Sequence, residues 1–140
     1  MRALAMAVLL LGCGQLDPEL GAEKTPTEGC VLEDSDPSDP VNFGEVRDEI
    51  FIPRCNCHTI AGGLGQTVGG LDLSDYDAMR EGGRVGKENV VVPGAPCESV
   101  IIQKTGEPPP FGARMPLSGL ELGTSSRQKL IDWIAEGARR

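Results

Sequence analysis

Proline and glycine interrupt this chain so often that it can form only short helices joined by loops. The 140 residues include 19 glycines and 11 prolines, and both residue types favour turns and end helices. Aromatic rings are scarce as well, with three Phe, one Tyr and one Trp. A domain of this size with so few rings has a thin core. A bulky apolar cofactor, or disulfide bonds, would help such a fold to hold together.

The first residues have the pattern of a targeting segment. A basic N-terminus precedes an uncharged apolar run, which is too short to span a bilayer and is typical of a secretory signal. The run ends in Leu-Leu-Gly before Cys13, and this resembles the bacterial lipobox, in which the cysteine carries acyl chains. We therefore expect a signal peptide over residues 1–12, lipidation of Cys13, and an extracytoplasmic protein anchored to a bacterial membrane, in the periplasm or at the cell surface. The alternative is ordinary signal cleavage nearby, with loss of Cys13.

Residues 13–42 have the composition of an acidic, proline-containing tether. From Gly14 to Asn42 the sequence holds eight acidic residues, one basic residue and four prolines. It shows no helical or strand period, so we expect an extended and solvated linker. This stretch carries most of the formal charge of −8, and an acidic chain is a poor electrostatic partner for nucleic acid. Cys30 lies within the stretch, which suggests a disulfide that pins the linker to the following domain.

Residues 43–140 have the pattern of one all-α domain. Apolar residues recur at helical spacing over 43–53, where a proline ends the helix. The last element is the clearest, because residues 124–136 begin with Thr-Ser, carry an apolar face and stop at a glycine. We expect shorter helices over 75–81 and after Pro96. No run of about 18 apolar residues occurs, so we expect no membrane-spanning helix.

The chemistry of the chain centres on Cys55, Cys57 and His58. A Cys-His pair that follows a helix is the core of the c-type haem attachment motif Cys-x-x-Cys-His. Here the spacing is Cys-x-Cys-His, and Arg54 stands where the first cysteine of that motif would be. Residues two apart on a helix point about 200° apart. We therefore expect a haem to form one thioether, through Cys57, while Cys55 faces away and is free for a disulfide.

Five short blocks of sequence follow one another across residues 43–140. They are Glu49–Cys55 with Cys57-His58, Gly69–Ser74, Val92-Pro93-Gly94 with Pro96 and Ser99, Arg114–Leu117, and Ile131–Ala138. Together they resemble the small cytochrome c domains of myxobacterial and planctomycete lipoproteins. The resemblance implies an all-α class I cytochrome c fold in which the first and last helices pack together.

The same resemblance implies a cofactor and its ligands. Cys55 and Cys57 would bind haem c, His58 would be the proximal ligand of the iron, and Met115 would be the distal ligand. The implied function is electron transfer with redox partner proteins, so the chain would be an electron carrier and not an enzyme.

A count of possible ligands agrees with this assignment. His58 is the only histidine, so two histidines of this chain cannot ligate one iron. Beyond the signal segment the only methionines are Met79 and Met115. Met79 falls inside an expected helix and suits core packing. Met115 lies in a proline-rich loop that can project its thioether toward a cavity, so we favour Met115 as the second ligand.

The residues leave other interpretations open. Cys55, Cys57, His58 and Cys97 could form a Cys₃His site for zinc or copper. The chain could also keep a cytochrome c-like scaffold without haem, as a surface lipoprotein stabilised by disulfides. Cys30, Cys55, Cys57 and Cys97 allow three full pairings, and we expect Cys55 to pair with Cys30 or Cys97 if it does not bind haem.

Overall fold

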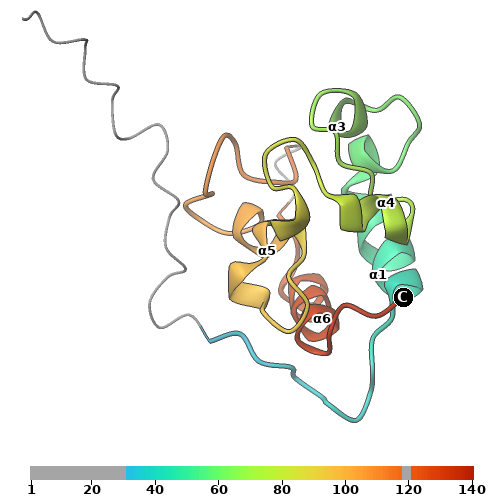
Figure 1. Ribbon diagram of the computed structural model, residues 1–140. Coiled ribbons are helices and arrows are strands. Elements are labelled where there is room, and N and C mark those ends of the chain that lie inside the picture. The colour runs from blue at the N-terminus through green and yellow to red at the C-terminus, as the bar shows by residue number, and fades with distance from the viewer. Residues whose placement is uncertain (1–30, 118–120) are drawn as a thin grey trace, which may run out of the picture.

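The computed structural model describes residues 31–117 and 121–140 (Figure 1). In these ranges the chain forms short helices joined by loops and contains no β-strand, apart from one isolated bridge between Gly83 and Lys87. The expected all-α class is therefore confirmed. The α-helices are α1 (Phe43–Val46), α2 (Ile52–Arg54), α3 (Leu64–Thr67), α4 (Tyr76–Glu81), α5 (Val100–Lys104) and α6 (Thr124–Ala135). Short stretches of π-helix (Arg47–Phe51) and 3-10 helix (Asn56–His58, Glu88–Val90, Pro96–Glu98) lie between them.

Several sequence-based predictions lie outside the described residues. These are the signal peptide over 1–12, the lipidation site Cys13, residues 13–30 of the predicted tether, and Cys30. No helix within the two described ranges is both long and apolar enough to cross a membrane.

The first helical segment runs without interruption from α1 through the π-helical stretch to α2. It begins after Asn42, whose side-chain oxygen accepts a hydrogen bond from the Glu45 N–H at 3.1 Å. Its apolar stripe faces the core, where Val46 and Ile50 are almost fully buried. The predicted helix over 43–53 is confirmed and continues one residue further, to Arg54.

The core forms where this first segment meets α6. The ring of Trp133 lies 6.0 Å from the ring of Phe43 and 6.4 Å from that of Phe51, measured between centroids. Leu130 and Ile134 on the same face of α6 are also buried. Each such side chain contributes about 1.5–3 kcal/mol when it leaves water. The expected packing of the first helix against the last is therefore confirmed.

A glycine ends α6 and turns the C-terminus back to α1 (Figure 1). Gly137 has φ +98°, and the Ala138 N–H donates to the Trp133 carbonyl at 2.8 Å. This arrangement is a Schellman motif, which uses carbonyls that the helix end leaves unpaired. The next residue, Arg139, then accepts a hydrogen bond from the Phe43 N–H at 3.0 Å. The residues after α6 therefore connect the end of the last helix to the start of the first.

Residues 31–42, which we call the N-terminal strap, lie along α6 (Figure 1). The N–H and the hydroxyl of Ser35 donate to the Asp132 carboxylate at 2.9 and 2.7 Å. The Val41 N–H donates to Glu136 Oε2 at 2.8 Å, and the Val41 side chain is buried. The strap has no helix or strand and most of it is exposed, as expected of an extended, solvated linker. Hydrogen bonds to the Asp132 carboxylate in α6 and to the Glu136 carboxylate directly after it also hold the strap on the domain, which the sequence does not predict.

Candidate functional site

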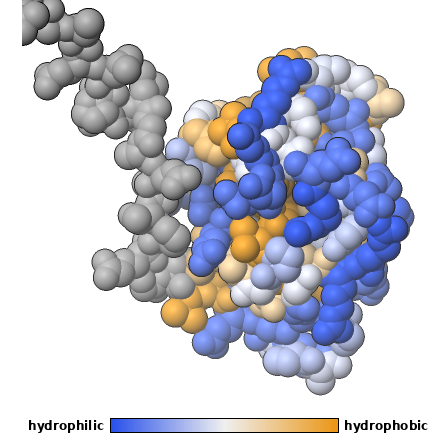
Figure 2. Space-filling view, viewed as in Figure 1, coloured by the Kyte–Doolittle hydropathy of each residue, from blue (hydrophilic) through white to orange (hydrophobic). Residues whose placement is uncertain are grey.

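A cavity of about 390 Å³ lies between the turn at Cys55–His58, the loops around residues 69–90, helix α5 and the loop 111–117. It contains all four residues predicted to bind a cofactor or its metal: Cys55, Cys57, His58 and Met115. Most of its other lining side chains are aliphatic, namely Leu71, Leu73, Val85, Val90, Val100, Ile101 and Leu117. Figure 2 shows apolar surface near the middle of this view, bordered by hydrophilic residues. The fold therefore gathers sulfur and nitrogen ligands in an apolar setting.

His58 is held with one ring nitrogen free to bind a ligand. Its Nδ1 lies 3.1 Å from the carbonyl oxygen of Leu71. A carbonyl only accepts hydrogen bonds, so Nδ1 carries the proton and donates, and Nε2 keeps its lone pair. Such a hydrogen bond fixes both the tautomer and the direction of a metal-binding imidazole. The His58 carbonyl is also held, because it accepts from the Leu73 N–H at 2.9 Å.

The imidazole stands in a space that only a glycine provides. Gly65 lies in α3 and is buried. A Cβ added to Gly65 would lie 2.4 Å from both Cγ and Nδ1 of the His58 ring. Gly65 belongs to the glycine-rich stretch Gly62-Gly63-Leu64-Gly65 that follows the Cys-His pair. The sequence predicts that these glycines let the chain pass close to a flat ligand or a neighbouring backbone, and at Gly65 the close neighbour is the His58 ring.

Both cysteines of the Cys-x-Cys-His sequence line the cavity. Helix α2 ends at Arg54, and Cys55 has φ −119° and ψ +32°, which is outside the helical region. A 3-10 turn over Asn56–His58 follows. The expectation that Cys55 faces away from Cys57 assumes one regular helix, whereas the helix breaks at Cys55. Cys55 and Cys57 are both free thiols that line the cavity.

Burial changes the acidity of one of these thiols. It raises the pKa of Cys55 to about 11, and the neighbouring Cys57 adds to the shift. The Cys55 sulfur therefore stays protonated at neutral pH. A protonated thiol is a weak nucleophile toward disulfides and a weak metal ligand.

Cys97 takes no part in the cavity and is disulfide-bonded. Cys55 and Cys57 are free, so neither of them is its partner. The expected pairing of Cys55 with Cys30 or Cys97 is therefore wrong. The Cys₃His site for zinc or copper is also contradicted, since Cys97 is unavailable. In the described ranges no three His, Cys, Asp or Glu side chains are placed to hold a metal ion together.

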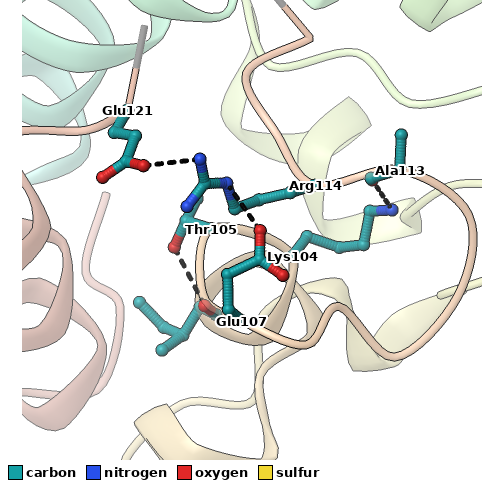
Figure 3. A network of polar contacts seen from close by, with 7 residues as sticks. Lys104, Thr105, Glu107, Ala113, Arg114 and Glu121 are labelled. Carbon is teal, nitrogen blue, oxygen red and sulfur yellow. Dashed lines mark hydrogen bonds and ion pairs between the residues drawn. The ribbon is translucent and has the colours of Figure 1, made fainter. Parts of the chain in front are cut away.

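Met115 lines the cavity and lies on a loop that Lys104 holds in place. Figure 3 shows the contact between Lys104 and Ala113 of this loop. The Met115 N–H donates to the Lys104 carbonyl at 2.8 Å. The Lys104 ammonium donates to the Phe111 carbonyl at 2.6 Å and to the Ala113 carbonyl, and it lies 4.6 Å from the centre of the Phe111 ring. Lys104 is only 9% exposed, and this burial lowers its pKa. One buried cation thus satisfies the polar groups of an otherwise irregular loop.

A second cation supports the same loop from outside. The Arg114 guanidinium lies 3.1 Å from the Glu107 carboxylate and 2.6 Å from that of Glu121 (Figure 3). Both carboxylates are exposed, and exposed ion pairs contribute about 1 kcal/mol or less. Their effect is mainly to fix the geometry of the loop. The sequence pattern indicates Met115 but not Lys104, because the partners of Lys104 are backbone carbonyls of an irregular loop.

The other methionine has the predicted place. Met79 lies in α4, is 1% exposed and belongs to the core cluster. It does not line the cavity. The interpretation of Met79 as a packing residue is confirmed.

Comparison with known proteins adds no assignment to this geometry. No family model, curated protein or solved structure matches the chain.

Proposed function

We propose that this protein is a c-type cytochrome with a class I cytochrome c-like fold, which carries electrons through a haem held between His58 and Met115. One observation carries the proposal. A single apolar cavity is lined by a histidine whose Nε2 is free, a methionine and two cysteines. These residues come from segments up to 60 residues apart in sequence.

The properties of the cavity fit a haem. Its volume of about 390 Å³ lies within the range of about 300–1,000 Å³ that is usual for sites of small molecules and cofactors. Imidazole and thioether are the two axial ligands of cytochromes c. Among the described residues that line the cavity, Arg54 and Lys104 are cationic and none is acidic. This charge suits a ligand that is apolar over most of its area and carries carboxylates at one edge.

The residues of the chain would each do a definite task. When bound, haem supplies a one-electron couple between ferrous and ferric iron. His58 presents Nε2 because Leu71 holds the proton on Nδ1. Met115 would supply a neutral sulfur ligand, and methionine ligation would raise the potential of the couple. The aliphatic walls of the cavity would keep water away from a bound haem.

The test of this function is covalent haem in the purified protein. The chain is produced in a bacterium that matures c-type cytochromes, with haem supplied. We expect a Soret band that survives acid-acetone extraction and an intact mass increased by one haem. His58→Ala should lose the normal spectrum, whereas Met79→Leu, a volume-conserving change in the core, should keep it. A colourless wild-type protein would contradict the proposal and support the scaffold without haem.

We also propose an extracytoplasmic location for the protein, anchored to a bacterial membrane by acyl chains on Cys13. The support is the lipobox-like sequence before Cys13 and the disulfide at Cys97, since structural disulfides persist in oxidising compartments. Redox partner proteins would then meet the domain near the membrane surface. Incorporation of labelled palmitate into the wild-type chain, and its loss in Cys13→Ser, is the expected result. Equal labelling of both would contradict it.

A further inference from the structure

The end of the molecule that contains α3 carries exposed aliphatic side chains. Ile60, in the turn before α3, is 58% exposed, and Leu64 and Val68 are 72% and 66% exposed. The Val68 N–H donates to the Leu64 carbonyl at 2.9 Å, so these two residues are one helical turn apart and share a face. Figure 2 shows hydrophobic residues at the upper edge of the molecule, where Figure 1 places α3. We call Ile60, Leu64 and Val68 the α3 patch.

The charge around the α3 patch differs from that of the whole chain. Residues 50–71 include one arginine and no Asp or Glu, and residues 82–87 include two basic residues and no Asp or Glu, although the chain has 21 acidic residues. The second of these segments borders α3. The Arg84 N–H donates to the Gly69 carbonyl at 2.9 Å, and the Arg84 guanidinium donates to the Thr67 carbonyl at 3.0 Å. An exposed cation therefore lies at the end of the helix that carries the patch.

The acidic N-terminal strap lies at the other end of the molecule. Figure 1 shows α3 at the top of the view and the strap with α6 at the bottom. Residues 31–42 contain four acidic residues and no basic residue. A domain of this size has a radius of gyration of about 13 Å, whereas exposed charges are screened beyond about 8 Å at physiological ionic strength. The negative charge of the strap therefore does not prevent an anionic surface from approaching the α3 patch.

An exposed aliphatic patch bordered by arginine has the composition of protein segments that lie in a membrane interface. The apolar side chains enter the boundary between headgroups and acyl chains, and the cation meets anionic headgroups. The proposed acyl anchor on Cys13 supplies such a surface. Residues 14–30 separate Cys13 from the strap, and when fully extended they would span about 60 Å. This length lets either end of the domain reach the bilayer, and because the contact is intramolecular, a weak affinity is enough.

We propose that the α3 patch docks on the membrane that anchors the protein, with its aliphatic side chains in the interface and Arg84 against anionic lipid headgroups. The inference rests on the proposed acyl anchor, which brings the bilayer within reach. Docking would also orient the cavity, because Gly65 in α3 closely approaches the His58 ring. The cavity would then lie near the lipid surface, where its electron-transfer partners would be embedded in the membrane.

The first experiment identifies the residues that meet lipid. The full chain with its anchor is reconstituted into vesicles of phosphatidylethanolamine and phosphatidylglycerol that contain a lipid with a photoreactive diazirine in its acyl chain. After illumination the protein is digested and the cross-linked peptides are identified by mass spectrometry. We expect cross-links within residues 60–70 and none within the strap. The absence of a cross-link within residues 60–70 would overturn the inference.

The second experiment compares two matched variants. Val68→Glu places a carboxylate in the α3 patch, and Val31→Glu makes the same change in the strap, at a valine that is 70% exposed. Both sites are on the surface, where substitutions seldom disturb the fold. The mature-length chain, residues 13–140, is produced without acyl groups and sedimented with the same vesicles. We expect Val68→Glu to weaken binding by about tenfold or more, and Val31→Glu to bind like the wild type. Equal binding of both variants would overturn the inference.

These measurements separate the inference from the proposed anchor. The unacylated chain has no anchor, so its binding to vesicles tests the α3 patch alone. Equal palmitate labelling of the wild type and Cys13→Ser would contradict the anchor alone. A second copy of the chain is the competing occupant of the patch. A wild type that is dimeric in sedimentation velocity, together with a monomeric Val68→Glu and no lipid cross-link, would overturn the inference in favour of that second copy.

Discussion

Replacement of Gly65 by alanine has two effects of opposite sign on the stability of the fold. Gly65 lies inside α3, where alanine is preferred over glycine by about 1 kcal/mol in helix propensity. On this ground alone the variant would be more stable than the wild type. The added Cβ, however, would lie 2.4 Å from Cγ and Nδ1 of His58. No real Cβ contact is that short, so the imidazole must move.

The structure indicates which effect is larger. Overpacking of a buried site costs about 1–3 kcal/mol. Displacing the ring also breaks the hydrogen bond of 3.1 Å from Nδ1 to the Leu71 carbonyl, which contributes about 1 kcal/mol. After the gain in propensity is subtracted, Gly65→Ala should lower the free energy of unfolding by about 1–3 kcal/mol. It should also weaken binding at His58 Nε2, because the ring no longer points in one direction.

The assay is urea unfolding of the wild type and the variant, together with titration of each reduced apoprotein with mesohaem, a haem whose two vinyl groups are replaced by ethyl groups. Gly123→Ala is the control, because φ is −58° at Gly123 and nothing lies within 4 Å of an added Cβ. We expect Gly123→Ala to change stability by less than about 0.5 kcal/mol. If Gly65→Ala were as stable as the wild type and bound mesohaem equally well, the close approach of α3 to His58 would not be what holds the imidazole.

Three further predictions concern the loop and the strap. Lys104→Met should lower the free energy of unfolding by about 1–3 kcal/mol, because the Phe111 and Ala113 carbonyls lose their hydrogen-bond donor. Urea unfolding would measure this loss, and proteolysis within the 105–117 loop should become faster. Unchanged proteolysis would contradict the role of Lys104. Asp132→Ala should release the N-terminal strap and lower the free energy of unfolding by a similar amount, because the Asp132 carboxylate accepts hydrogen bonds from Ser35 and Gln128. Hydrogen exchange at the Ser35 amide should become faster. Unchanged protection of this amide would refute the role of Asp132. Burial raises the pKa of Glu136 above 4.5, so the folded state binds more protons than the unfolded state and stability falls as pH rises from 4.5 through the folded pKa. Glu136→Gln should remove that part of the pH dependence in unfolding curves, and an identical dependence in both proteins would contradict the assignment.

The parts of the fold that sequence predicts are those with local signals. The last helix was expected over 124–136 and is observed over Thr124–Ala135, because its apolar face and its terminal glycine are close together in sequence. The packing of the two terminal helices was likewise visible from their apolar stripes. The four candidate ligands that line the cavity, Cys55, Cys57, His58 and Met115, follow from residue type. His58 is the only histidine, and the surroundings of the two methionines favour Met115.

The parts that sequence missed depend on long-range contacts or on a local break. The N-terminal strap contacts α6 through Ser35 and Asp132, which are 97 residues apart in sequence. Hydrophobic periodicity, which is a local pattern, does not predict contacts between such distant polar residues. The chain also leaves the helix at Cys55, where a single non-helical residue redirects it, and helical spacing does not describe such a turn. Lys104 was overlooked because its partners are carbonyls of a loop whose path the sequence does not reveal.

The central claim is that His58 and Met115 hold one iron inside the cavity. Iron K-edge X-ray absorption of the purified protein loaded with haem measures it most directly, because it reports which elements are bound to the metal. The account predicts one sulfur ligand on the iron in the wild type and in Met79→Leu, and none in Met115→Leu. An iron without sulfur in the wild type, or a sulfur ligand that persists in Met115→Leu, would contradict the account.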